Sequence, residues 1–305
     1  MSLVTNSQAV PSRLYAIYAA LFDSENGEVK DRIEGWATPP SLTTRGGDDD
    51  GTSTTTLFSN TLQEAKRLGL VEENDGKLRL TSIARNGAKK GQDSQSQFLS
   101  VMRQVLFDSS KAAETDQTQF MFALTWFLSA SPLRPLNFSE APQNDIKAQI
   151  GPGIEKTGLT SAHHLQTFFY WARYLGFATI LGGGSDPDDV TSRRVFPDPV
   201  RAIESALPSI FSDTKDMPID QFLGRLAAIF PVFEMGTVRQ EYDGMRLNPA
   251  AEANQRLSVS TSFALQRLSD RQVLSLESVS DASIRIMDLG NRVERVSRVG
   301  LRTAA

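Results

Sequence analysis

The chain contains two histidines, and they are neighbours, His163 and His164. Adjacent residues on a helix point about 100° apart, so the two imidazole rings cannot easily share one metal ion. No acidic cluster follows at helical spacing to complete a metal site. The ordinary interpretation is that one ring faces the core and the other faces solvent. The alternative is that both lie at the start of a helix that reads nucleic acid and contact a phosphate or a base.

Other patterns that often carry chemistry are incomplete. Gly182-Gly183-Gly184 lacks the Lys-Ser/Thr of a phosphate-binding loop, so a turn is the better interpretation. Asp48-Asp49-Asp50 lacks the alternating ligands and the distal glutamate of a calcium-binding loop. The chain has no cysteine, and no serine lies in a GxSxG motif. We therefore expect no catalytic residue, no metal and no cofactor, although a nuclease built on a pair of carboxylates stays open.

Amide, hydroxyl and basic side chains on the polar faces of three expected helices are better candidates for binding. Such groups suit the base edges and backbone phosphates of double-stranded DNA. The alternative is that they form the ordinary solvent-facing side of amphipathic helices. The candidates are Ser59, Asn60, Gln63, Lys66 and Arg67 in the first helix; His163, His164, Gln166, Thr167 and Arg173 in the second, with Arg193 and Arg194 on the hairpin that follows; and Arg267 and Arg271 in the third.

The clearest structural pattern in the chain lies at residues 57–82. Apolar residues from Leu57 to Leu68 recur at helical spacing, and Gly69 stands where the helix should end. Residues 74–76 are Asn-Asp-Gly, a sequence typical of a tight hairpin turn. Leu78 and Leu80 then alternate with polar residues, as expected for a half-buried strand. A helix followed by a β-hairpin is the second half of a winged helix.

The same order of helix, strand, turn and strand recurs at residues 160–198 and, less regularly, after residue 258. In the third copy, residues 273–276 and 284–287 are expected to pair as a hairpin. We expect Ser12 to cap the first helix, Asp198-Pro199 to start another, and residues 82–97 to be a linker. Residues 41–56 are polar, glycine-rich and acidic, and are expected to form a mobile loop. Because this loop would hinder phosphate binding by the first copy, the second copy is the better candidate for nucleic acid.

Composition and length limit the classes of protein that are possible. The chain has 305 residues, of which 40% are hydrophobic, so it can form two or three compact domains. A net charge of −4 argues against coating nucleic acid non-specifically but does not exclude a local basic face. We predict a mainly α protein with small β-hairpins, built from tandem winged-helix modules joined by helices. The expected domains are residues 1–90, 98–200 and 201–305.

Targeting signals are not evident in the sequence. The first residues, MSLVTNSQAVPSR, lack the charged and apolar regions of a secretory signal. The longest apolar run, residues 120–130, is about half of the ~20 residues that a membrane-spanning helix needs. We therefore expect a cytoplasmic protein that does not bind membranes.

Three features together resemble proteins of the DpdG type. They are Pro11-Ser12-Arg13 ahead of the first helix, the helix and hairpin at 57–82, and the His163-His164-Leu165-Gln166 helix before a second hairpin. The resemblance extends to the length and layout of most of the chain. It implies an accessory protein of bacterial clusters that insert 7-deazaguanine derivatives into DNA and restrict unmodified DNA. It also implies a helicase or a nuclease as partner, and it transfers no catalytic residue.

We predict a non-catalytic, DNA-associated adaptor of a DNA-modification or phage-defence complex. One alternative is a sequence-specific transcription regulator, which would form a symmetric dimer and bind one operator. A second alternative is a scaffold whose winged helices bind only proteins.

Overall fold

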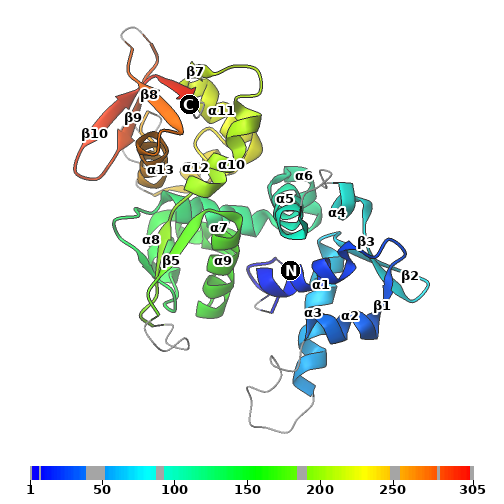
Figure 1. Cartoon of the computed structure of the whole chain (residues 1–305). Coiled ribbons are helices and arrows are strands. Elements are labelled where there is room, and N and C mark those ends of the chain that lie inside the picture. The colour runs from blue at the N-terminus through cyan, green and yellow to red at the C-terminus, as the bar shows by residue number, and fades with distance from the viewer. Residues whose placement is uncertain are drawn as a thin grey trace. The chain divides into compact units, whose positions relative to one another are not determined.

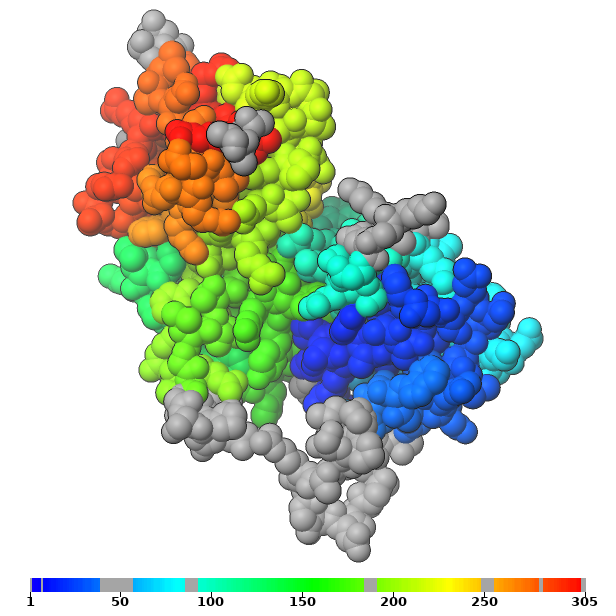
Figure 2. Space-filling view, in the orientation of Figure 1, coloured from blue at the N-terminus to red at the C-terminus, as the bar shows by residue number. Residues whose placement is uncertain are grey.

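The computed structural model describes residues 2–6, 8–38, 52–86, 93–183, 191–247, 255–279 and 282–302. The chain forms two compact units, Met1–Gln117 and Thr118–Ala305, coloured blue to cyan and green to red in Figure 2. The described residues are mainly helical, with three small antiparallel three-stranded sheets and one two-stranded ribbon. The predicted fold class is confirmed at this level. The predicted domain boundaries stay predictions.

The first unit consists of six helices and one sheet among its described residues (Figure 1). They are α1 (Pro11–Phe22), β1 (Glu28–Val29), α2 (Lys30–Ala37), α3 (Thr52–Arg67), β2 (Val71–Asn74), β3 (Lys77–Leu80), α4 (Ser82–Asn86), α5 (Ser94–Phe107) and α6 (Ser109–Glu114). The sheet has the order β1-β3-β2, so that the last strand in the sequence is the central one.

The pattern predicted for residues 57–82 is confirmed in this unit. Gly69 ends α3 with a φ of +68°, a backbone conformation that glycine adopts without steric cost. Asp75 and Gly76 have φ values of +51° and +73°, as a hairpin turn between two antiparallel strands requires. Local sequence signals were sufficient here because each one acts on the residues next to it.

Four local predictions need correction. Residues 52–56 begin α3 instead of belonging to a loop, and residues 41–51 lie outside the described residues. Residues 82–97 contain α4 and the start of α5, and the buried Gln97 donates to the carbonyl oxygens of Ala84 and Arg85 at 3.2 Å each. Val10 precedes α1, with Pro11 as its first residue, so Ser12 is not the cap. Pro199 precedes α10, and no side chain caps that helix.

The second unit contains the remaining elements. They are α7 (Thr118–Ser129), β4 (Leu136–Asn137), α8 (Gln143–Ile150), the 3-10 helix η2 (Gly151–Thr157), α9 (Ala162–Leu175), β5 (Ala178–Leu181), β6 (Arg194–Pro197), α10 (Val200–Ile210), β7 (Asp216–Pro218), α11 (Ile219–Ile229), α12 (Thr237–Met245), α13 (Val259–Asp270), β8 (Leu274–Glu277), β9 (Arg285–Asp288), β10 (Val293–Val296) and β11 (Arg298–Leu301).

Two sheets of this unit repeat the arrangement found in the first unit. Their strand orders are β4-β6-β5 and β7-β11-β8, so the last strand in sequence is again central. In all three sheets a helix precedes the first strand, and helices lie between the first and second strands. Figure 1 shows the second of these groups, with α9 beside α7 and β5.

The predicted hairpin of the third copy is wrong. β8 pairs with β11, from Leu274 opposite Leu301 to Glu277 opposite Arg298. Residues 285–288 instead pair with β10, and β9 and β10 form the separate two-stranded ribbon. The residues between β8 and β11 alternate like strands, so periodicity alone could not show which of them are partners.

Candidate nucleic-acid interface

Helix α9 has clear signals at both ends. The side chain of Ser161 accepts a hydrogen bond from the backbone N–H of His164 at 3.2 Å and caps the N-terminus. Gly176 ends the helix with a φ of +91°. The inner face buries Leu165, Phe168, Phe169, Trp171, Ala172 and Leu175. Phe168 and Phe169 pack on Phe127 of α7, with ring centroids 5.7 and 5.6 Å apart, which fixes the face that α9 turns outward.

The outer face of α9 carries four residues at intervals of three, four and three. They are His163, Gln166, Tyr170 and Arg173, and this spacing places them in one stripe along the helix. His163 and Arg173 are exposed, and Gln166 and Tyr170 are partly buried. The stripe therefore offers an imidazole, an amide, a phenol and a guanidinium to a partner. Tyr170 was not among the predicted residues, although extending the stripe from Gln166 to Arg173 would have found it.

Two other predicted residues of α9 have local roles. Thr167 is buried, and its hydroxyl donates to the carbonyl oxygen of His163 at 3.0 Å, so we leave it out of the candidate surface. Nδ1 of His164 lies 3.0 Å from the hydroxyl of Thr160. Because His163 is exposed and His164 is only partly buried, neither ring belongs to the core as the ordinary interpretation expected.

The two arms of the hairpin formed by β5 and β6 stay close together just beyond the last pair of the ladder. A Cβ atom added to Gly182, whose φ is +88°, would lie 2.6 Å from the carbonyl oxygen of Ser192, so only glycine fits this close approach. Arg194 is opposite Leu181 in the ladder, and both side chains are exposed. The guanidinium of Arg194 donates to the carbonyl oxygens of Thr191 and Arg193. Residues 184–190 lie outside the described residues.

Phe138 joins this hairpin to α9. Its ring is 1% exposed and makes an edge contact with Tyr170, with centroids 5.3 Å apart. The guanidinium carbon of Arg193 lies over the same ring, 5.5 Å from its centroid. The backbone N–H of Phe138 also donates to the carbonyl oxygen of Arg193 at 3.2 Å. Sequence reasoning missed Phe138, because no local pattern indicates which side chains meet its ring.

The predicted residues of the first helix, α3, are mostly engaged within the first unit. Arg67 pairs with the buried Glu64 and donates to the carbonyl oxygen of Thr115. Lys66 pairs with Glu73 on β2, and the amide of Asn60 donates to the side chain of Gln8. Ser59 is partly buried and Gln63 is exposed. The basic groups of this face therefore have carboxylate partners already.

The predicted arginines of the third helix, α13, also have partners. Arg267 donates to Asp198 at 2.7 Å, and Arg271 donates to both carboxylate oxygens of Glu204 at 3.0 and 2.8 Å. Asp198 lies two residues before the start of α10, and Glu204 lies on this helix. These ion pairs join α13 to α10 and use the charges that were predicted to contact DNA.

Arg173 and Arg194 differ from these arginines. Neither pairs with a carboxylate within the part of the chain that the structure describes. An exposed guanidinium without a counter-charge attracts anions more strongly than one that is already paired. The second group of elements is thus the one whose predicted helix and hairpin carry arginines without a carboxylate partner among the described residues.

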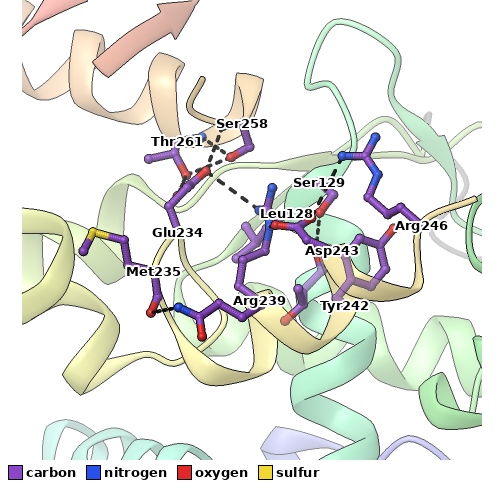
Figure 3. Close-up of polar contacts among 12 residues, drawn as sticks. Leu128, Ser129, Glu234, Met235, Arg239, Tyr242, Asp243, Arg246, Ser258 and Thr261 are labelled. Carbon is purple, nitrogen blue, oxygen red and sulfur yellow. Dashed lines mark hydrogen bonds and ion pairs between the residues drawn. The ribbon is translucent and has the colours of Figure 1, made fainter. Parts of the chain in front are cut away.

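A second cluster of charged groups lies inside the same unit (Figure 3). Glu234 is 8% exposed, and its carboxylate accepts the backbone N–H of Ser258 at 2.7 Å and the hydroxyl of Thr261 at 3.0 Å. Arg239 lies between Glu234 and Asp243 and donates to Asp243 at 2.8 Å. Burial by itself would lower the pKa of Arg239, but the two carboxylates raise it above its ordinary value. This network fixes α12 against the start of α13, and we interpret it as structural.

No group of three or more histidine and carboxylate side chains is arranged to hold a metal ion within the described residues. No helix in the same part of the chain is both long and apolar enough to cross a bilayer.

The elements and the site define a mainly helical protein with repeated small antiparallel sheets and a polar helix face beside a hairpin whose second strand region carries two arginines. The model of the DpdG-like family matches residues 1–282, and the chain belongs to this family. The family suggests an accessory role in 7-deazaguanine modification clusters and association with a modification or defence complex. No curated protein and no solved structure matches the chain significantly.

Proposed function

We propose that the protein is a non-catalytic, DNA-associated adaptor of a DNA-modification or phage-defence complex. Each of its three groups of elements follows the order of a winged helix: a helix, a short strand, further helices and two more strands of the same sheet, with the last strand central. In the third group the ribbon β9–β10 is inserted between those two strands. We propose that the group from α7 to β6 contacts double-stranded DNA. The family's accessory role in DNA-modification clusters supports this proposal.

The two arginines on α9 and on strand β6 that lack a carboxylate partner among the described residues carry the proposal. In α3 and α13 the equivalent arginines are paired with carboxylates, whereas Arg173 and Arg194 have no such partner among the described residues. Most of the affinity of proteins for DNA comes from basic groups that neutralise phosphates. A surface whose basic side chains are already paired with carboxylates gains little binding free energy from DNA phosphates. The group of elements from α7 to β6 is therefore the better candidate.

The proposed mode places α9 in the major groove. His163 and Gln166 lie in its N-terminal half, where an amide can pair with the edge of adenine. Arg173, Arg193 and Arg194 would contact the backbone. Residues 184–190 include Asp186, Asp188 and Asp189, which would repel phosphates. The last pair of the ladder, Leu181 opposite Arg194, and not the loop 184–190 beyond it, is therefore the part of the hairpin proposed to touch DNA.

A salt series of DNA-binding measurements tests this proposal. An Arg173→Ala/Arg194→Ala variant should bind a mixed-sequence duplex more weakly, and the slope of log affinity against log salt should fall by roughly 1 to 2. The matched control is Arg267→Ala/Arg271→Ala, which also removes two exposed arginines and should keep the slope. Equal losses of DNA affinity in the two double variants, or no DNA binding by the unaltered protein, would contradict the proposal. Tight binding to one sequence by a symmetric dimer would favour a transcription regulator instead.

A second candidate function, docking of a protein partner, is favoured by the surface of α2. Arg32 and Trp36 are exposed four residues apart on α2, so they lie on one face of the helix, and the exposed Val29 directly precedes the helix. Trp36 is 52% exposed, and the guanidinium of Arg32 lies 5.2 Å from its ring centroid. Tryptophan and arginine are the residues most enriched at the energetic centres of protein interfaces.

Tryptophan fluorescence can test this second function. Of the three tryptophans, Trp126 and Trp171 are fully buried, so a change in emission on adding a partner reports mainly on Trp36. Purified proteins encoded in the same cluster should shift the emission of the unaltered protein to shorter wavelength. The Trp36→Phe variant should lose both this signal and part of the affinity. A partner that binds both proteins equally, without a spectral change, would show that docking occurs elsewhere.

A further inference from the structure

The two outer edges of the β9–β10 ribbon differ in their hydrogen bonding. On the β9 side, the backbone N–H of Ile286 donates to the carbonyl oxygen of Gln255 at 2.9 Å. The carbonyl oxygen of Ile286 accepts the N–H of Leu257, also at 2.9 Å. The N–H of Asp288 donates to the hydroxyl of Ser262 at 3.0 Å. Other parts of the second unit therefore already occupy the outer edge of β9.

The outer edge of β10 has no such neighbour. In the ladder, Val293 is opposite Asp288 and Arg295 is opposite Ile286. Opposite residues of an antiparallel pair point their backbone groups either toward each other or both away. Because Ile286 and Asp288 point theirs away, the N–H and C=O groups of Val293 and Arg295 face outward from β10. Within the described residues no backbone hydrogen bond reaches these groups, so the edge is free to pair with another strand.

The side chains along this edge combine one apolar residue with two opposite charges. Val293 is 59% exposed. Its neighbours Arg292 and Glu294 lie on the other face of the strand, where Nε of Arg292 is 2.8 Å from the carboxylate of Glu294. The order of charges along the strand is thus positive, then negative. An identical strand running in the opposite direction presents the negative charge first, so the edge is complementary to itself.

We propose that β10 pairs with β10 of a second copy of this chain, in an antiparallel ladder whose two-fold axis passes through Val293. In this register the two Val293 side chains are opposite each other, and Arg292 of each copy is opposite Glu294 of the other. The contact uses the same surface of both copies, as a symmetric dimer requires. The proposal goes beyond the DNA contact described above and does not depend on it.

The backbone geometry places the opposite charges where they interact most strongly. Val293 points its N–H and C=O toward the partner strand, so the two Val293 residues form the hydrogen-bonded pair. Arg292 and Glu294 then form the non-hydrogen-bonded pairs on either side, in which side chains of the two strands lie closest. Each copy thus contributes one arginine and one glutamate to two equivalent cross-strand ion pairs.

Like charges disfavour the neighbouring symmetric registers. An axis through Glu294 would place two carboxylates directly opposite each other. An axis through Arg292 or Arg295 would do the same with two guanidinium groups. Like charges at such positions destabilise a ladder. Of the axes through residues 292–295, the one through Val293 is therefore the one that brings opposite charges together without opposing like charges.

Sedimentation equilibrium of the full chain over a concentration series measures this association. A short ladder buries less than the ~1,200 Å² of a typical stable interface, so we expect a reversible dimer with a dissociation constant on the order of 100 μM. Glu294→Arg and Arg292→Glu each place like charges opposite each other twice. Each variant alone should therefore have a dissociation constant about tenfold higher or more.

An equimolar mixture of Glu294→Arg and Arg292→Glu tests the register itself. In the mixed dimer, both positions of one copy are basic and both positions of the other are acidic, so every cross-strand pair is again attractive. The mixture should associate about as tightly as the unaltered protein, which two unfolded variants could not do. The matched control is Glu72→Arg on β2, which reverses one charge of another exposed ion pair, with Arg79, and should leave the dimer unchanged.

Three outcomes would overturn the proposal. The first is an unaltered protein that stays monomeric up to several hundred micromolar, the range that a weak dimer requires. The second is a dimer that both charge-reversal variants retain, since the copies would then meet through another surface. The third is a mixture that associates no better than either variant alone. A dimer by itself does not favour a transcription regulator, which also needs tight binding to one operator.

Discussion

Arginine has different roles at equivalent places in the three groups of elements. Arg67 holds a buried carboxylate, and Arg271 binds both oxygens of Glu204, whereas Arg173 is exposed on α9 without a carboxylate partner among the described residues. All were predicted from the same criterion, a basic residue on the polar face of a helix. The sequence could not separate them, because Arg271 and Glu204 are 67 positions apart. The free energy that such an arginine contributes to folding depends on that distant partner.

Because the hydroxyl of Tyr242 is buried, the free energy of unfolding of the second unit should decrease at alkaline pH. Burial raises the pKa of Tyr242 to about 12, since the phenolate would be poorly solvated there. Because the folded-state pKa exceeds the unfolded value near 10, the stabilisation is complete below pH 10 and is lost as pH rises through 12. We expect the unfolding free energy of the unaltered protein to fall by up to about 2 kcal/mol more over this interval than that of Tyr242→Phe.

Chemical denaturation at several pH values, monitored by circular dichroism, measures this difference. The variant loses the hydrogen bond from Tyr242 to Gln149, 3.0 Å long, so it should be less stable at neutral pH. Its curve should nevertheless be flatter above pH 10. Parallel curves for the two proteins would show that the Tyr242 hydroxyl does not titrate in this way.

At the scale of elements, the N-terminus of α13 depends on a carboxylate that lies outside the helix. Glu234 accepts two hydrogen bonds at this end and also faces Arg239. Glu234→Ala should lower the unfolding free energy by about 2–3 kcal/mol, because it removes charged hydrogen bonds and weakens the pairing of a buried guanidinium. Glu234→Gln, which keeps an acceptor, should lose less.

The control is Glu241→Ala on α12, whose half-exposed carboxylate pairs with Lys156 at the surface. Its effect should stay within about 0.5 kcal/mol. Thermal unfolding of the three variants under one condition makes the comparison. If Glu241→Ala lowered the stability as much as Glu234→Ala does, the burial of Glu234 would not explain its contribution to stability.

The elements that the sequence predicted correctly are those whose signals act locally. The turn at Asp75-Gly76 and the end of α9 at Gly176 each need a positive φ, so the residue type itself indicates the geometry. The pairing of β8 with β11 is different, because the ribbon β9–β10 lies between them in the sequence. The candidate site also has one part that the sequence predicts and one part that it does not. The stripe on α9 follows from helical spacing, whereas the meeting of Phe138 with Arg193 depends on the folded sheet.

At the scale of the whole molecule, the chain divides between Gln117 and Thr118 into two compact units. Each unit has its own buried core, centred on residues such as Tyr18 and Phe98 in the first and Phe127 and Phe168 in the second. We expect fragments 1–117 and 118–305 to fold separately, because a compact unit with its own core can do so.

Fragment 118–305 should also retain the DNA affinity and salt slope of the full chain, while fragment 1–117 should bind duplex DNA weakly at most. Circular dichroism and the same binding assay measure both properties. Folding of both fragments with loss of DNA binding in 118–305 would mean that the first unit supplies contacts. An unfolded 118–305 fragment would contradict its independence.

The central position of the last strand has a consequence for the protein during its synthesis. β7 leaves the ribosome about eighty residues before β11, and β8 leaves about twenty-five residues before it, as their positions near 217, 275 and 299 indicate. Until β11 arrives, these strands have no central neighbour, and unpaired strand edges favour aggregation. The nascent third sheet is thus the part of the chain for which a chaperone would matter most, whereas the first sheet can close once residue 80 has emerged.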